Sequence, residues 1–486
     1  MMTQILISLL LLPIMLGSLN ILSRRGWLSY YITLLTTTLT SVAAACILMH
    51  VMEFGEMHYY FGGWLPPIGI ALRINLLSAL FLNVISGAAF FTCLYGKNIL
   101  YNEINEKKIP LLCSIFLICL AGLFGIILTN DFFNLYVFIE IASLSTYALV
   151  SIGYNRSASK SAFYYLIAGT IGATFILLGI GFLYSSSGTL NMTDFTNQLS
   201  KFENVIIIKV ASYLMLIGLF IKCGLFPLHS WMVDAYRNSN SFVLTFIGSI
   251  STKAYIVVLL KLIYFVFMPY YILGETPIQN FMFVCGVLAI VVGASAAIHQ
   301  NDFRSMLAFS SVSQIGFIFI AVATGTNTAL ASAIILIISH VIAKLSLFMI
   351  SSDIYYQKRS YHISVLYSIS KESPFTLALF IANAGSLIGI PLTAGFIGKF
   401  TLIIALAESK LWVLIAVVAF GSFVTFKYLW RFFEIFTADK KTPAPSIASN
   451  NLCKIVAGFL TAVNILIGVS YTTVVELVNK IVNLIN

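Results

Sequence analysis

Six ionisable side chains lie inside strongly apolar stretches of the sequence, where a charge is costly to keep. They are Glu140, Lys222, Lys253, His340, Lys344 and Lys399. A charged group at the centre of a bilayer costs about 2.5–3.5 kcal/mol on insertion scales, and such groups usually mark ion pathways or proton relays. Carboxylate, imidazole and ammonium groups can all bind and release protons. We therefore expect these six residues to carry out proton transfer.

Glu140 and Lys222 are predicted to act as a pair. Glu140 lies near the centre of TNDFFNLYVFIEIASLSTYALV (residues 129–150), and Lys222 lies just before the Gly and Pro of KCGLFP (residues 222–227). A low-dielectric site disfavours the charged form of lysine, whereas a nearby carboxylate favours it. We expect Lys222 to gain or lose a proton as Glu140 approaches or leaves. The alternative is a static pair that only holds two helices together.

The other four residues lie in sequences that suit a proton relay. Lys253 lies in SISTKAY, whose hydroxyl groups can hold water, and the alternative is a lysine that extends to the cytoplasmic interface. His340 and Lys344 are four residues apart, which places them on one helix face, and histidine titrates near neutral pH. Lys399 follows a second Gly and Pro interruption and matches Lys222 in kind.

The elements that must position these groups are membrane spans. The chain has 486 residues, of which 60% are hydrophobic and only 9% charged, whereas a soluble domain has about 25% charged residues. An all-α polytopic transmembrane bundle is therefore expected, and the net charge of +10 indicates basic cytoplasmic loops rather than a nucleic-acid surface. A span needs about 20 apolar residues in a helix. Fourteen are predicted, at 3–22, 29–52, 72–94, 110–129, 132–153, 160–184, 206–235, 241–268, 279–298, 303–323, 328–352, 373–406, 411–433 and 452–472.

The loop charges predict the side of the membrane that each loop faces. Most Lys and Arg residues fall in alternate loops, such as those that contain Arg24, Lys107, Arg156 and Lys358. Because cytoplasmic loops collect positive charge, we expect these loops in the cytoplasm and both termini outside it. One missed or invented span would scramble the alternation, so the asymmetry favours a count of fourteen.

Two of the predicted spans share an interruption. The seventh contains the Gly and Pro after Lys222, and the twelfth (373–406) contains Gly389 and Pro391 and is too long for one straight crossing. Gly and Pro in mid-span leave backbone groups that only protein or water can satisfy. The two spans are five apart, so units made of spans four to eight and nine to thirteen would have opposite orientations. Paired broken helices in inverted halves are typical of transporters.

Several common cofactor motifs are absent from the sequence. It contains no GxxxxGK[ST] phosphate loop, and Gly179-Ile-Gly181 lacks the third glycine and the flanking strand of a dinucleotide site. The seven cysteines form no CxxC pair, and no Cys/His cluster has metal-ligand spacing. We expect no cofactor and no metal in this chain, so any redox chemistry must belong to another subunit.

Taken together, these motifs resemble one known family. In one order the sequence has Glu140 in NDFFNLYVFIEIASLSTYAL, Lys222 in IKCGLFPLHSWMVDAY, Lys253 in STKAY, the stretch DFRSMLAFSSVSQIGF, His340 with Lys344, and Lys399 in IGIPLTAGFIGKF. The set is similar to the proton-pumping, antiporter-like subunits of respiratory complex I and of Mrp-type cation/proton antiporters, over roughly residues 70–435. The FNLYVFIE phrase and the length look most like the D subunit of the Mrp antiporter (also called Mnh or Pha).

The resemblance implies a domain organisation. It implies N-terminal helices one to three (1–109), a first inverted repeat of helices four to eight (110–268), a second of helices nine to thirteen (279–433), and helix fourteen with a tail (452–486). Helices seven and twelve would be broken. The sequence departs from the family in two places: Arg-Asn-Ser-Asn-Ser follows the seventh span where relatives often have Pro-Ser, and the twelfth span has one proline where they often have two.

The resemblance also implies roles and partners. Glu140 and Lys222 would form the charge pair of the first half-channel, and Lys253 would connect it to the centre. His340 and Lys344 would carry protons onward to Lys399 in the second half-channel. The chain would exchange H⁺ for Na⁺ or K⁺ with other subunits of a hetero-oligomeric complex in a bacterial plasma (inner) membrane, and would be no enzyme by itself. Two alternatives stay open: a proton-pumping membrane-arm subunit of NADH:quinone oxidoreductase or a related membrane hydrogenase, and a scaffold with inert charges.

Overall fold

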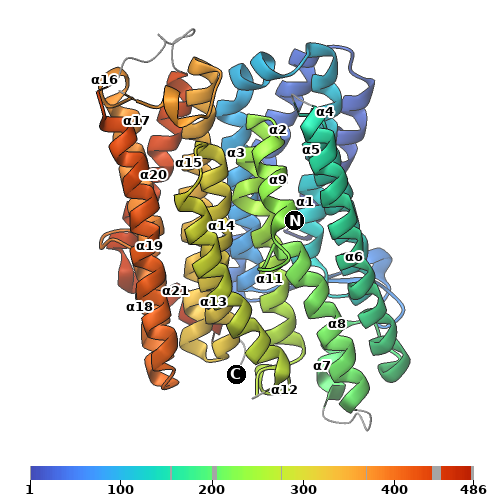
Figure 1. The fold of residues 1–486 in the computed structure, drawn as a ribbon. Helices are drawn as coiled ribbons and strands as arrows, with labels where there is room; N and C mark the ends of the chain where they lie inside the picture. The colour runs from blue at the N-terminus through green and yellow to red at the C-terminus, as the bar shows by residue number, and fades with distance from the viewer. Residues whose placement is uncertain are drawn as a thin grey trace. The chain divides into compact units, whose positions relative to one another are not determined.

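The computed structural model describes residues 2–153, 156–199, 205–274, 276–367, 369–439 and 450–482. Within these ranges almost all regular structure is α-helical, which confirms the predicted fold class (Figure 1). Thirteen of the described helices are long and apolar enough to cross a membrane. The chain divides into two compact units, each of which has its own core.

The first unit contains Met1–Cys93, Ile104–Cys223 and Ile250–Gly274. Its helices are α1 (Met2–Leu22), α2 (Gly26–Phe54), most of α3 (Leu76–Glu103), α4 (Ile109–Leu128), α5 (Phe132–Ser151), α6 (Arg156–Ser187), α7 (Met192–Gln198), α8 (Val205–Cys223), α11 (Thr252–Leu260) and α12 (Pro269–Ile272). Helices α4 and α5, and likewise α6 and α8, pack along each other. The backbones of α6 and α8 lie very close at Gly218: a Cβ atom on this residue would lie only 2.4 Å from the carbonyl oxygen of Gly172. Small residues at helix contacts allow such an approach.

The second unit contains Leu94–Glu103, Gly224–Ser249 and Glu275–Asn486. Its helices are α9 (Ser230–Asn238), α10 (Ser241–Phe246), α13 (Pro277–Ile298), α14 (Phe303–Thr324), α15 (Asn327–Lys358), α16 (Ile369–Glu372), α17 (Pro374–Ile388), α18 (Ala394–Glu408), α19 (Trp412–Thr437), α20 (Asn451–Val469) and α21 (Tyr471–Val482). Helices α13 and α14 pack along each other. Helix α15 is central to this unit, because it packs against α14, α17, α18 and α20.

The predicted spans agree closely with these helices. The thirteen crossing helices correspond to thirteen of the fourteen predicted spans, and the fourteenth, at 373–406, is α17 followed by α18. Each of these two half-helices has 15 residues, and Gly389 interrupts the backbone between them with a φ of 91°. Helix α8 likewise ends at Cys223, and α9 begins only at Ser230. The predicted breaks in spans seven and twelve are therefore confirmed.

The eighth span is irregular in a way that the sequence did not predict. Two π-helical stretches, Ile247–Ser251 and Lys261–Val266, flank α11. Single π-helical turns inside α-helices are frequent at functional sites. The first stretch ends two residues before Lys253, and the second begins with Lys261, the other lysine of this span.

A short β-hairpin joins α2 to α3 and was also not predicted. Strands β1 (Met57–Tyr60) and β2 (Ala71–Ile74) are antiparallel, with Met57 opposite Ile74 and Tyr60 opposite Ala71. The main-chain N–H of Asn130 donates to the carbonyl oxygen of Ala71 at 2.9 Å, which ties the hairpin to the turn between α4 and α5. The hairpin therefore marks one end of the first unit, called the hairpin end below.

Gly395, at the start of α18, should not tolerate a side chain. A Cβ atom there would lie 1.9 Å from the carbonyl oxygen of Ser386 on α17. We expect Gly395→Ala to destabilise the protein by about 1–3 kcal/mol through overpacking, measured as a lower melting temperature of the detergent-purified chain. Gly181→Ala is the matched control, because no heavy atom beyond its chain neighbours and the nearby backbone of its own helix lies within 4 Å of the Cβ position in Gly181. Equal melting temperatures of the two variants would contradict this close approach.

Candidate functional site

Glu140 and Lys222 meet in the first unit, as predicted. Glu140 is on α5 and Lys222 is in the last turn of α8, with 3.8 Å between Glu140 Oε1 and Lys222 Nζ. The lysine side chain is 1% exposed, whereas that of Glu140 is 25% exposed. The ammonium group is thus fully enclosed, and its counter-charge lies at the edge of the site.

The direct hydrogen-bond partners of Lys222 are neutral hydroxyl groups. Lys222 Nζ donates to Ser143 Oγ at 2.7 Å and to Tyr147 Oη at 3.2 Å. A separation of 3.8 Å is too long for an ordinary hydrogen bond, so the carboxylate of Glu140 acts on Lys222 mainly through its charge. Ser143 and Tyr147 follow Glu140 by three and seven positions, which puts all three on one face of α5. That spacing is the signal that the sequence reasoning missed.

Helix α11 reaches this site through a tyrosine. Tyr255 Oη and Ser143 Oγ are hydrogen-bonded at 3.0 Å, so a chain of hydrogen bonds runs from Lys222 through Ser143 to Tyr255. Lys253 is buried on the same helix, two residues before Tyr255, and is 2% exposed. The first unit therefore contains three of the six predicted residues, and Tyr255 is a further one that the sequence reasoning did not single out.

His340 and Lys344 lie one turn apart on α15, in the second unit. They are 3% and 0% exposed. Lys344 Nζ donates to the carbonyl oxygen of Leu307 at 2.6 Å and to Ser310 Oγ, both on α14. The lysine thus has a serine hydroxyl among its partners, as Lys222 does, and a main-chain carbonyl group beside it.

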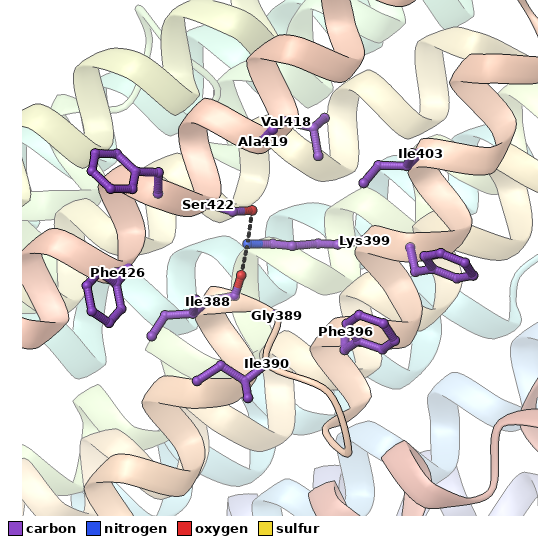
Figure 2. A pocket seen from close by; sticks show the side chains of 12 residues that line it. Ile388, Gly389, Ile390, Phe396, Lys399, Ile403, Val418, Ala419, Ser422 and Phe426 are labelled. Carbon is purple, nitrogen blue, oxygen red and sulfur yellow. Dashed lines mark hydrogen bonds between the residues drawn. The ribbon is translucent and has the colours of Figure 1, made fainter.

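Lys399 lies on α18, beside the break in the twelfth span (Figure 2). Its Nζ donates to the carbonyl oxygens of Leu387 and Ile388 at 2.8 and 3.0 Å, and to Ser422 Oγ of α19 at 3.1 Å. Leu387 and Ile388 are the last residues of α17, whose carbonyl groups have no partner within the helix. The ammonium group therefore caps the negative end of the half-helix dipole.

An open cavity of about 450 Å³ adjoins Lys399. Figure 2 shows that its wall is apolar, with Phe396, Ile403 and Phe426 among the side chains around the lysine. Lys399 and Ser422 are the two polar side chains that line it. Lys399 therefore borders an open space as well as the packed helices.

The opposite half of the same break is held by Asn464 on α20. Its Oδ1 accepts hydrogen bonds from the main-chain N–H of Ala394 at 3.3 Å and from Ser386 Oγ at 3.1 Å. Ser386 Oγ in turn accepts from the N–H of Gly395 at 3.2 Å. The N-cap residue, Thr393, makes no side-chain cap. The first N–H groups of α18 are thus satisfied by α17 and α20, which the sequence could not reveal because these residues are far apart in the chain.

The six predicted residues form two groups. Glu140, Lys222 and Lys253 belong to the first unit, and His340, Lys344 and Lys399 to the second. All except Glu140 are buried. Their connection into one continuous row stays a prediction, as do their individual roles.

A comparison with known families places this chain. The family described as "NADH:quinone oxidoreductase/Mrp antiporter, TM" matches residues 129–425, more than half of the sequence. The chain belongs to this family. The match includes all six predicted residues, and it confirms the family that the motifs indicated.

Two curated relatives show the range within the family. The N subunit of NADH-quinone oxidoreductase from Desulforudis audaxviator is 36% identical over 396 residues, covering 81% of this chain and 78% of the relative. The D subunit of the Na(+)/H(+) antiporter from Alkalihalophilus pseudofirmus is 26% identical over 444 residues, covering 90% and 88%. The predicted likeness to the Mrp-type D subunit is confirmed, and the N subunit is a second close likeness.

Two solved structures have the same fold. A chain of the membrane-bound sulfane sulfur reductase, an archaeal respiratory membrane complex, superposes with a TM-score of 0.90 at 28% identity, covering 99% of this chain and 97% of that one. A chain of the Mrp complex from Dietzia sp. DQ12-45-1b superposes with a TM-score of 0.89 at 22% identity, with the same coverage. The fold is therefore that of a polytopic, antiporter-like membrane subunit.

Asn464 should be needed for the ordered start of α18. Asn464→Leu removes the acceptor for Ala394 N–H and Ser386 Oγ, and a buried unsatisfied group costs about 1–3 kcal/mol. We expect faster amide hydrogen exchange in residues 394–398, measured by mass spectrometry. Leu466→Ala, at an exposed position of the same helix, is the control and should leave the rate close to that of the unchanged protein. Unchanged exchange in Asn464→Leu would show that the cap is dispensable.

Proposed function

We propose that this chain is the proton-translocating subunit of a multi-subunit cation/proton antiporter, and that it moves H⁺ in exchange for Na⁺ or K⁺. The observation that carries the proposal is the Glu140–Lys222 pair, at 3.8 Å in the first unit. A buried ammonium beside a carboxylate that is not hydrogen-bonded to it can change its charge when that carboxylate moves. A membrane-embedded pair that served only to hold helices would gain more from direct contact.

The hydroxyl partners suit a lysine that changes protonation state. Lys222, Lys344 and Lys399 each donate to a serine hydroxyl: Ser143, Ser310 and Ser422 respectively. A hydroxyl group accepts a hydrogen bond from an ammonium group and donates one to a neutral amine. The lysine therefore keeps a hydrogen-bond partner in both states.

The six residues take the roles that the family resemblance implies. In the proposal, Lys222 releases its proton when Glu140 withdraws its charge, and Lys253 receives it. His340 and Lys344 pass protons within the second unit towards Lys399. The two five-helix repeats, 110–268 and 279–433, each supply one half of the route.

Partners and location follow from the relatives. The relatives carry names of subunits, and the two solved structures are multi-subunit membrane complexes. We propose that this chain works in a hetero-oligomeric complex of the bacterial plasma membrane, with both termini outside the cytoplasm. It would be a transporter subunit and no enzyme by itself.

A second candidate is a redox-driven, proton-pumping membrane-arm subunit. The 36% identity to the N subunit of an NADH-quinone oxidoreductase favours it. The same charged residues would move protons, and the energy would come from electron transfer in another subunit. Purification of the chain with its native partners, followed by an absorbance spectrum, separates the two candidates. Flavin or iron–sulfur absorbance in the complex would overturn the antiporter proposal.

Removal of either member of the charge pair should stop exchange. In vesicles that contain the assembled complex, we expect Glu140→Ala and Lys222→Ala to lower cation/proton exchange at least tenfold, since the counter-charge or the proton carrier is lost. Exchange is measured with a pH-sensitive dye after addition of Na⁺ or K⁺. Lys160→Ala, at an exposed lysine on α6, is the control. Exchange at the unchanged rate in both pair variants would favour a scaffold.

A further inference from the structure

Lys261 is a buried ammonium group that the proposed function does not use. It begins the second π-helical stretch of the eighth span, eight residues after Lys253, and is 8% exposed. Eight residues correspond to about two helical turns. Residues 254–260, AYIVVLL, contain one polar side chain, that of Tyr255. Lys261 is therefore the next titratable group towards the hairpin end after these residues.

The ammonium group of Lys261 is held by the main chain. Its Nζ donates to the carbonyl oxygen of Thr129 and, at 3.4 Å, to that of Ile127, at the end of α4. None of the carboxylates in the described ranges forms an ion pair with it. The two carbonyl dipoles therefore stabilise a protonated Lys261, but no negatively charged group in the described part of the chain compensates its charge.

Two spaces that share lining residues lie between Lys261 and the hairpin end. Lys261 lines a small cavity of about 10 Å³ together with Asn75, Asn130 and Thr193, which is room for about one water molecule. Asn130 and Thr193 also line a larger open pocket of about 310 Å³, and the Asn130 amide donates to Thr193 Oγ1 at 2.8 Å. One hydrogen-bonded pair of side chains thus borders both spaces.

The larger pocket, called the hairpin pocket, has both polar and apolar side chains in its wall. Its wall includes His58 and Tyr60 of β1, Asn191, Asp194 and Asn197. These side chains supply carboxylate, imidazole, amide and hydroxyl groups, which are groups that hold water and exchange protons with it. The pocket lies at one end of the span, whereas Lys253 lies further inside it.

Few charged groups lie near Lys261, and each of them has a contact of its own. Arg73 lines the small cavity, and its guanidinium group is paired with Glu56 at 2.9 Å. Asp194 accepts a hydrogen bond from Gln198 Nε2 at 2.8 Å, and Asp131 caps the start of α5. His58 lies 3.8 Å from Glu56. Among the described residues, Lys261 is thus the buried basic group between these side chains and α11.

We propose that Lys261 is the group that exchanges protons between the buried charges of the first unit and the solution at the hairpin end, through the hairpin pocket. The proposal rests on the proposed function, because it needs protons to reach Lys253. A neutral Lys261 takes a proton from the interior, and the resulting ammonium group is stabilised by the Ile127 and Thr129 carbonyl groups. It then gives the proton to water in the pocket.

The competing explanation is that Lys261 only caps α4. Lysine side chains often bind the last carbonyl groups of a helix. Two substitutions separate the explanations. Lys261→Gln keeps an N–H donor for the carbonyl groups and cannot carry a proton, and Lys261→Arg keeps the donors and the charge and does not release its proton near neutral pH.

The first experiment measures cation/proton exchange in vesicles that contain the assembled complex. We expect both Lys261→Gln and Lys261→Arg to lower exchange at least tenfold, at unchanged amounts of assembled complex. A cap would be restored by either substitution, so exchange within twofold of the unchanged protein in either variant overturns the proposal. One pattern of results would separate this inference from the proposed function. If Lys222→Ala abolishes exchange while both Lys261 variants keep it, this inference is wrong and the proposed function still stands.

A second experiment blocks the pocket without changing Lys261. Asn197 is exposed and lines the hairpin pocket. We expect a bulky, membrane-impermeant thiol reagent to lower exchange at least fivefold in Asn197→Cys, and to leave Ser185→Cys, at an exposed position on α6, unaffected. The unsubstituted protein, treated in the same way, controls for its own cysteines. Full exchange in labelled Asn197→Cys overturns the proposal, and this result decides the matter if the Lys261 variants do not assemble.

Discussion

In the hydrocarbon core of a bilayer, every main-chain polar group must find its partner inside the protein, and a charged side chain is costly there. This constraint decides where a lysine can be kept. Lys222, Lys344 and Lys399 are each 5% exposed or less, and each has a serine hydroxyl within hydrogen-bonding reach. Lys344 and Lys399 add main-chain carbonyl oxygens. The apolar helices therefore contain a few small polar junctions, and the chemistry of the chain is confined to them.

A broken helix supplies the main-chain partners of Lys399. At the break between α17 and α18, the carbonyl groups of Leu387 and Ile388 accept from Lys399, and the N–H group of Ala394 donates to Asn464. An unbroken helix would have used all these groups internally. Lys222 also lies beside a break, in the last turn of α8, but its direct partners are the hydroxyl groups of Ser143 and Tyr147.

The sequence predicted the spans, their two breaks and the buried charges, because hydrophobic length, Gly and Pro, and isolated ionisable residues are local signals. It did not predict the partners. Ser143 and Tyr147 were readable in principle from their spacing to Glu140 on one helix face. Asn464 and Ser422 were not, since their importance depends on which distant helices pack together. The π-helical stretches and the hairpin also depend on tertiary packing, which can override local propensity.

The choice of neutral partners has a consequence for how such a site works. A carboxylate in direct contact with a buried ammonium would fix its proton, since separation would leave an uncompensated charge in a low dielectric. A hydroxyl group binds either form of the amine, so the balance between the two forms is set by more distant charges. Glu140, at 3.8 Å and 25% exposed, is placed to be such a charge. It is close enough to act on Lys222 through the low-dielectric interior, and no hydrogen bond between them has to break when it moves.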